Sequence, residues 1–195
     1  MKTTAYYSVE APHFYHRSRI RSEHTTLAEP VEETINHEAF HQMAEGQLPD
    51  LREFCLALAG IMHSARAPES AEDLLPFLDS LPELDEPAIK ALQKLSATRF
   101  VLISGERFEL VLNHWKPGKA TDIHGHPSGG CIFKLLYGKV EEVRYTPAPG
   151  NKFLGFVSHK TGDLGNIDNG AAYHQVGNPY GRSAVSIHIY LKKSI

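Results

Sequence analysis

The part of the chain that follows Arg99 limits the fold most, because short β-rich runs alternate there with clusters of Gly, Pro, Asn and Asp. The clearest turn signals include Pro149-Gly150-Asn151. Many short strands at such spacing are typical of a β-sandwich or barrel. We therefore predict a mainly β fold from these runs: Arg107–His114, Cys131–Leu136, Val140–Tyr145, Phe153–Ser158 and Ala184–Leu191.

A helical pattern precedes the strands, between Glu32 and Leu95. Asp50 can cap a helix with an apolar stripe formed by Leu51, Phe54, Leu58 and Met62. The segment Ser70-Ala71-Glu72-Asp73 resembles a capping box, and Pro87 suits the start of a further helix. Because apolar stripes need a partner surface, we expect these helices to pack on one side of the β domain.

The change of pattern also predicts how the chain is divided. Residues 1–28 are polar, with aromatic and charged residues mixed without a clear period, and they suggest an N-terminal arm. A helical subdomain follows at 29–96 and a β-barrel domain at 97–195. A chain of 195 residues suits a single structural unit that contains both.

Composition argues against several classes of partner. A net charge of -3 indicates no large basic surface, so we expect no nucleic-acid partner. No apolar run approaches the ~20 residues that span a bilayer, and the first seven residues lack an apolar signal core. We expect a cytoplasmic protein without a membrane partner, either a monomer or a weak homo-oligomer. A structural disulfide between Cys55 and Cys131 is not favoured in that reducing compartment.

The pair His124 and His126 is the most informative feature for function. On a strand, side chains alternate, so both imidazoles lie on one face, about 6–7 Å apart. Two such imidazoles can bind one metal ion together with a third ligand from elsewhere. His174 is the best candidate because it follows a turn and begins a predicted strand. Three protein ligands leave positions open for substrate and oxygen.

Two motifs in this region resemble those of the cupin superfamily. The first is matched in spacing by Gly118, His124, His126 and Gly138. Cys131 stands where the motif has a glutamate. Residues 162–178 resemble the second motif, with Asp168 where proline is usual and His174 displaced by one residue. Alternatively, the histidines are core residues or turn caps, but this does not explain the joint spacing. The resemblance implies a cupin (jelly-roll) β-sandwich or barrel with a metal held by the three histidines.

Cys131 in place of the glutamate resembles the cysteine dioxygenase family, which carries a cysteine there. The segment Ser186-Ile187-His188-Ile189-Tyr190 resembles that family's Ser-x-His-x-Tyr motif. The resemblance covers roughly residues 95–191. It implies Fe(II) as cofactor and a thioether cross-link between Cys131 and Tyr190. It also implies that Ser186 orients His188, which hydrogen-bonds the Tyr190 hydroxyl. Without the resemblance, Cys131 and Tyr190 read as ordinary core residues.

Arg99 resembles the arginine with which this family binds the substrate carboxylate. The planar fork of arginine donates two parallel hydrogen bonds to a carboxylate. Arg107 is nearer to the histidines but aligns better with a basic residue that opens the next strand. The family often has a tyrosine two residues before the arginine, where this chain has Ala97. The alternative for Arg99 is a solvated surface charge.

The resemblance implies an iron-dependent thiol dioxygenase that oxidises L-cysteine with O2 to cysteine sulfinate. Three neutral imidazoles leave the charge of Fe(II) uncompensated, which favours an anionic ligand such as a substrate thiolate. Another small thiol acid such as 3-mercaptopropionate is an alternative substrate, although relatives with that preference usually lack the cysteine. A cupin with Cys131 as a metal ligand and a non-catalytic metal-binding cupin also stay open.

Overall fold

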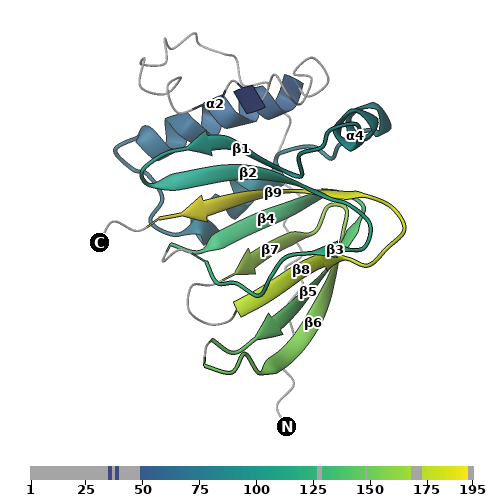
Figure 1. The fold of residues 1–195 in the computed structure, drawn as a ribbon. Helices are drawn as coiled ribbons and strands as arrows, with labels where there is room; N and C mark the ends of the chain where they lie inside the picture. The colour runs from purple at the N-terminus through teal and green to yellow at the C-terminus, as the bar shows by residue number, and fades with distance from the viewer. Residues whose placement is uncertain are drawn as a thin grey trace, which may run out of the picture.

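The computed structural model describes residues 35–36, 38–39, 49–126, 129–147, 149–167 and 173–192. Two antiparallel β-sheets face each other, and helices cover the outer side of one of them (Figure 1). This confirms the predicted mainly β, cupin-type sandwich with helices packed on one side. The predicted arm at 1–28 lies outside the described residues.

The larger sheet has five strands in the order β1-β2-β9-β4-β7. Their bounds are β1 Arg99–Ser104, β2 Phe108–Trp115, β9 Ala184–Leu191, β4 Cys131–Tyr137 and β7 Leu164–Ile167. The smaller sheet has four strands in the order β3-β8-β5-β6. Their bounds are β3 Lys119–Ala120, β8 Tyr173–Asn178, β5 Lys139–Tyr145 and β6 Phe153–Lys160. Each of the five predicted runs coincides with one of these strands.

The helices before the sheets are α2 (Pro49–His63), the 3-10 helix η3 (Ala71–Leu74), α3 (Leu75–Asp79) and α4 (Glu86–Gln93). The capping box is confirmed, because Ser70 accepts from the Glu72 N–H while its own N–H donates to the Asp73 carboxylate. Asp50 is not the cap of α2. The helix begins at Pro49, so Asp50 lies in its first turn, where a negative charge still suits the helix dipole.

The two faces of the five-stranded sheet have different neighbours. The outer face packs with the helices in one core cluster that includes Leu58, Leu78, Leu92, Leu110, Leu112, Ile132, Ile187 and Ile189. Because side chains alternate along a strand, Cys131, Ser186, His188 and Tyr190 lie on the inner face, toward the four-stranded sheet. The helices therefore bury one face. The other face lines the space between the sheets, which holds these polar side chains and a second apolar cluster formed by Trp115, Leu135, Val140, Val176 and Ala184.

Lys134 joins the helical layer to the sheet. Its side chain is only 7% exposed, and its ammonium donates to the backbone carbonyls of Asp79 at 2.5 Å and Leu81 at 2.9 Å. The Asp79 carboxylate lies 3.3 Å away. A lysine charge at the end of α3 satisfies carbonyls that the helix leaves unpaired. This clamp holds α3 against β4. Among the described residues, no helix is long and apolar enough to cross a membrane.

Candidate metal centre

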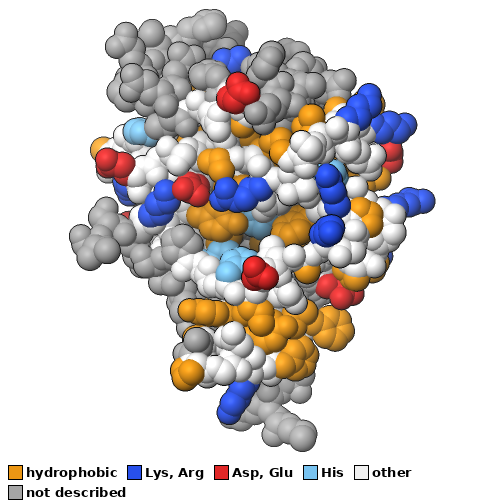
Figure 2. Space-filling view, viewed as in Figure 1, with side chains coloured by type: hydrophobic (Ala, Val, Ile, Leu, Met, Phe, Trp, Pro, Cys, Tyr) orange, Lys and Arg blue, Asp and Glu red, His pale blue; other side chains and the backbone are white. Residues whose placement is uncertain are grey.

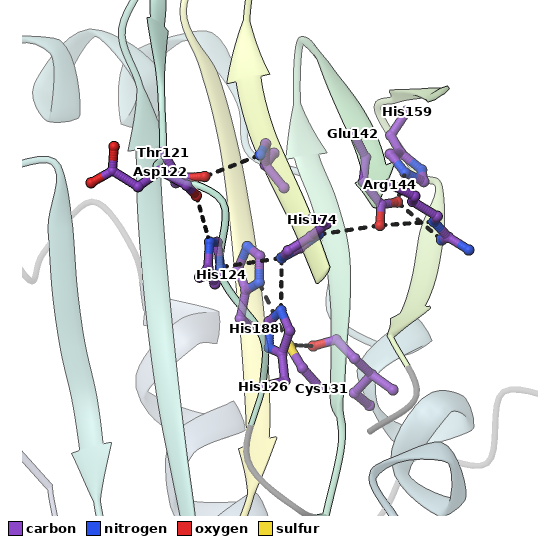
Figure 3. Close-up of polar contacts among 12 residues, drawn as sticks. Thr121, Asp122, His124, His126, Cys131, Glu142, Arg144, His159, His174 and His188 are labelled. Carbon is purple, nitrogen blue, oxygen red and sulfur yellow. Dashed lines mark hydrogen bonds and ion pairs between the residues drawn. The ribbon is translucent and has the colours of Figure 1, made fainter. Parts of the chain in front are cut away.

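Three histidines converge between the two sheets, with ligand nitrogens that all lie within 4.8 Å of one another (Figure 3). The Nε2 atom of His174 is 2.7 Å from Nε2 of His126 and 3.2 Å from Nε2 of His124. His174 belongs to β8. His124 forms an isolated antiparallel bridge with it, in which each backbone N–H donates to the other carbonyl at 2.9 Å. The structure thus brings the three predicted ligands together.

The local backbone differs from the prediction that both ligands of the His-x-His pair lie on a strand. Strand β3 ends at Ala120, and His126 follows the bridge at His124 in an irregular segment. The reason lies at Thr121, whose hydroxyl accepts from the Val176 N–H at 3.1 Å while its own N–H donates to the Val176 carbonyl. This side-chain bond takes the place of a regular ladder bond, so the strand does not continue.

Hydrogen bonds fix the tautomer of two of these imidazoles. Nδ1 of His124 lies 2.9 Å from the Asp122 carbonyl, and Nδ1 of His174 lies 3.2 Å from the Glu142 carboxylate. Because a carbonyl and an ionised carboxylate only accept, each Nδ1 carries the proton and each Nε2 presents a lone pair. Burial lowers the pKa of His124, and it lowers the pKa of His126 to about 3. Neutral imidazoles are the form that binds metals.

The spacing of the Nε2 atoms fits a metal ion. The Nε2 lone pairs of His124 and His174 are 3.2 Å apart and repel each other unless a cation lies between them. Ligands that meet at right angles with metal–nitrogen bonds of ~2.1 Å stand about 3.0 Å apart. Among the described residues, the Nδ1 atom of His126 is buried without a hydrogen-bond partner. The donor set, three imidazoles and no direct carboxylate, suits a divalent transition metal.

Glu142, which was not identified from the sequence, contacts the candidate ligand His174 on its Nδ1 side. It lies on β5, its side chain is 1% exposed, and it accepts from His174. The remaining partners of its carboxylate are His159 at 3.1 Å and Arg144 at 2.9 and 3.0 Å. Although burial opposes ionisation, these donors hold the pKa of Glu142 below its ordinary value. A charged carboxylate is therefore buried next to one candidate ligand.

Cys131 and Tyr190 are cross-strand neighbours beside the histidines. They lie opposite each other in the register of β4 and β9. The Tyr190 ring stacks on His126 with centroids 5.6 Å apart and on His188 at 5.9 Å, both nearly parallel. Burial raises the pKa of the Cys131 thiol and of the Tyr190 hydroxyl, so both stay protonated at neutral pH. A thiol and a phenol thus meet next to the three imidazoles.

Ser186 and His188 stand as expected on the same face of β9, but their hydrogen bonds continue to a residue that the sequence did not indicate. The indole N–H of Trp115 donates to Ser186 Oγ at 2.7 Å, and Ser186 Oγ is 2.7 Å from His188 Nε2. Burial, with the neighbouring histidines, lowers the pKa of His188 to about 3. Among the hydrogen bonds of the described residues, Nε2 is the one acceptor for the Ser186 hydroxyl proton, so Ser186 donates to Nε2 and the His188 proton is on Nδ1.

The proton on Nδ1 of His188 points toward sulfur. Nδ1 is 3.9 Å from Cys131 Sγ. The expected hydrogen bond from His188 to the Tyr190 hydroxyl is not among those of the described residues, and the two rings are stacked instead. The reason is the ring orientation: Ser186 occupies Nε2, which leaves only Nδ1 free, on the side of the cysteine.

Arg99 stands at the start of β1, with a side chain that is 54% exposed. Its Nη2 atom is 3.7 Å from Glu109 Oε2, and Glu109 lies opposite Tyr190 in the register of β2 and β9. The Arg99 charge lowers the pKa of both Tyr190 and His188, although burial outweighs it at Tyr190. Lys192 donates to the other Glu109 oxygen at 2.8 Å. Figure 2 shows histidine side chains at the surface, with basic and acidic side chains close to them.

Two comparisons with known proteins match this chain to cysteine dioxygenases. The family model described as cysteine dioxygenase type I matches residues 87–193. The cysteine dioxygenase type 1 of Danio rerio is 25% identical over 150 residues, which cover 63% of this chain and 75% of that protein.

Solved structures of cupins are more distant. A cupin 2 conserved barrel domain protein from Salinispora arenicola is 21% identical, with a TM-score of 0.39 over 48% of this chain and 74% of that one. A cupin domain from Bordetella pertussis is 22% identical, with a TM-score of 0.39 over 49% of this chain and 92% of that one.

Proposed function

The chain belongs to the cysteine dioxygenase type I family, and on that premise we propose that it is an iron-dependent thiol dioxygenase that oxidises L-cysteine with O2 to cysteine sulfinate. One observation carries the proposal: Cys131 and Tyr190 are cross-strand partners, and the Tyr190 ring stacks on His126 of the three-histidine centre. The packing of a protein core does not by itself explain why a thiol and a phenol lie next to three converging imidazoles.

His124, His126 and His174 are proposed to hold Fe(II). Bound Fe(II) supplies a site at which a thiolate and O2 meet and exchange electrons. The three imidazoles would contribute no charge, because a metal binds the neutral form of histidine, and two of them already present a bare Nε2. With the metal bound, a substrate thiolate would supply the negative charge that the imidazoles lack, because a metal ion lowers the pKa of a bound thiol from the usual ~8.5.

Arg99 is proposed to bind the substrate carboxylate. Its single ion pair among the described residues is the loose 3.7 Å contact with Glu109, so most of its five N–H donors are available. A bidentate contact would fix the orientation of the substrate relative to the histidines. Its contact with Glu109, which lies opposite Tyr190 in the register of β2 and β9, supports a carboxylate position on the Tyr190 side of the centre.

Tyr190 is proposed to orient the substrate and O2 through its hydroxyl, with Cys131 holding the ring in place. The family resemblance implies a thioether bond between the Cys131 sulfur and the Tyr190 ring. Forming this C–S bond removes the thiol hydrogen and one ring hydrogen, and O2 is the two-electron oxidant. Cross-strand pairing supports this step because directly opposed residues have Cβ atoms ~5 Å apart.

A cupin in which Cys131 is itself a metal ligand is less well supported. Its sulfur contacts the Ile132 carbonyl, His188 and Tyr190, and within the described ranges the candidate ligand group consists of the three histidines.

An oxygen-electrode assay tests the proposal. Protein loaded with Fe(II) is mixed with cysteine, homocysteine, cysteamine or 3-mercaptopropionate, and the product is identified by mass. We expect uptake with cysteine to be the fastest and to yield the sulfinate. Faster turnover of 3-mercaptopropionate would reassign the substrate. No uptake with any thiol would refute the dioxygenase and favour a non-catalytic metal-binding cupin.

A further inference from the structure

We propose that Glu142 and Arg144 together set the metal affinity of the three-histidine centre, Glu142 by strengthening His174 as a ligand and Arg144 by opposing it. Both are positioning residues that act through His174. The inference rests on the proposed metal site but not on the reaction that takes place there.

The four side chains involved lie on the inner face of the smaller sheet. Arg144 of β5 is directly opposite His174 of β8, and Glu142 stands two residues before Arg144 on the same face. His159 reaches the group from β6. Figure 3 shows Glu142 between His174 on one side and Arg144 and His159 on the other. Strand register rather than a flexible loop therefore fixes the group.

Each oxygen of the Glu142 carboxylate is shared between two donors. Oε1 accepts from Arg144 Nε at 2.9 Å and faces His174 Nδ1 at 3.2 Å. Oε2 accepts from Arg144 Nη2 at 3.0 Å and faces His159 Nε2 at 3.1 Å. The bidentate contact with arginine keeps the carboxylate ionised although it is buried. The same oxygen that faces the candidate ligand is thus also bound by a cation.

A carboxylate behind a histidine increases the basicity of the opposite ring nitrogen. It takes up the positive charge that the imidazole acquires on binding a metal, and it keeps the ring in the orientation that binds. Many iron oxygenases place a carboxylate directly on the metal. Here the three candidate ligands are histidines and include no carboxylate. The buried carboxylate of Glu142 instead contacts Nδ1 of the ligand His174.

Arg144 acts in the opposite direction. Its contact with Oε1 is shorter than that of His174, so the guanidinium withdraws charge from the oxygen that His174 uses. Its side chain is 28% exposed, whereas Glu142 is buried, so the arginine can be neutralised with less disturbance of the core. The two changes, loss of the carboxylate charge and loss of the guanidinium charge, therefore predict opposite effects on the metal.

The test is the dissociation constant of Co(II), measured by competition with a coloured chelator, in wild type and three variants. Glu142→Gln removes the buried charge, and we expect roughly 10-fold to 100-fold weaker binding. Arg144→Gln should bind Co(II) more tightly than wild type. Glu141→Gln is the matched control: it makes the same change on the neighbouring residue, which faces outward and accepts from Tyr180. It should bind as wild type does.

A second readout is the Fe(III)/Fe(II) midpoint potential of the iron-loaded proteins. We expect it to rise in Glu142→Gln, because a buried negative charge favours Fe(III), and to fall in Arg144→Gln. Weaker Co(II) binding in both variants would show that the group is only structural and would overturn the proposal, as would equal affinities of Glu142→Gln and Glu141→Gln. If Glu142→Gln does not fold, the sign of the change in Arg144→Gln decides. Wild type that binds metal without oxidising thiols would refute the proposed function alone.

Discussion

Replacing Trp115 with phenylalanine tests the hydrogen-bond chain that ends at Cys131. The change removes the indole N–H from Ser186 Oγ, a 2.7 Å contact between buried groups, and leaves most of the aromatic packing. A hydrogen bond of this kind contributes about 1 kcal/mol net. Ser186→Ala costs more, about 2–4 kcal/mol, because it leaves two buried groups unpaired, the indole N–H and His188 Nε2.

A double variant that carries both Trp115→Phe and Ser186→Ala shows whether the two side chains interact or contribute to stability independently. Once Trp115 is phenylalanine, Ser186→Ala leaves only one buried group unpaired, so the two costs should fall short of additivity by about 1 kcal/mol. Urea unfolding of the four proteins measures this coupling. Costs that add to within about 0.4 kcal/mol would refute the contact and, with it, the assignment of the His188 proton to Nδ1.

Three further predictions follow from other parts of the molecule. Arg99→Gln should raise the KM for cysteine and change that for cysteamine, which lacks a carboxylate, far less in steady-state oxygen uptake; equal changes for both thiols would remove Arg99 from carboxylate binding. Lys134→Met should lower the free energy of unfolding by about 2–4 kcal/mol, because two carbonyls lose their donor, and urea titration checks this. Without metal, stability should fall as the pH is lowered from about 6.5 toward 3, because His126 and His188 take up protons in the unfolded chain and resist them when folded. A melting temperature that is constant over that range in the presence of a chelator would contradict the burial of neutral histidines.

The sequence was sufficient for the fold class and for the residues that meet at the centre. The turn signals and β-rich runs predicted β2, β4, β5, β6 and β9 but gave no run for β1, β3 or β7, and the spacing of the glycines and histidines predicted which imidazoles converge. It was not sufficient for the backbone at His124 and His126. A hydroxyl-to-backbone bond at Thr121 ends the strand there, and nothing in the pattern of residue types reveals such a local competition.

The residues that hold the histidines in place could not be identified from the sequence, because their contacts depend on strand register, which a single sequence does not reveal. In the run that became β5, Glu141 and Glu142 are adjacent acids, and alternation alone does not say which one faces inward. Structure shows Glu142 buried behind His174 and Glu141 outside. Trp115 was missed for the same reason, because its partner Ser186 lies 71 residues away on a strand that pairs with β2.

Three histidines are proposed to hold an iron with which the protein adds both atoms of O2 to a thiol. The most direct measurement is turnover of cysteine by Fe(II)-loaded protein under ¹⁸O2, with the sulfinate analysed by mass and His124→Ala as the control. We predict two labelled oxygen atoms in each sulfinate formed by wild type and no sulfinate from the variant. A product with one labelled oxygen or none, or normal turnover by His124→Ala, would contradict the claim.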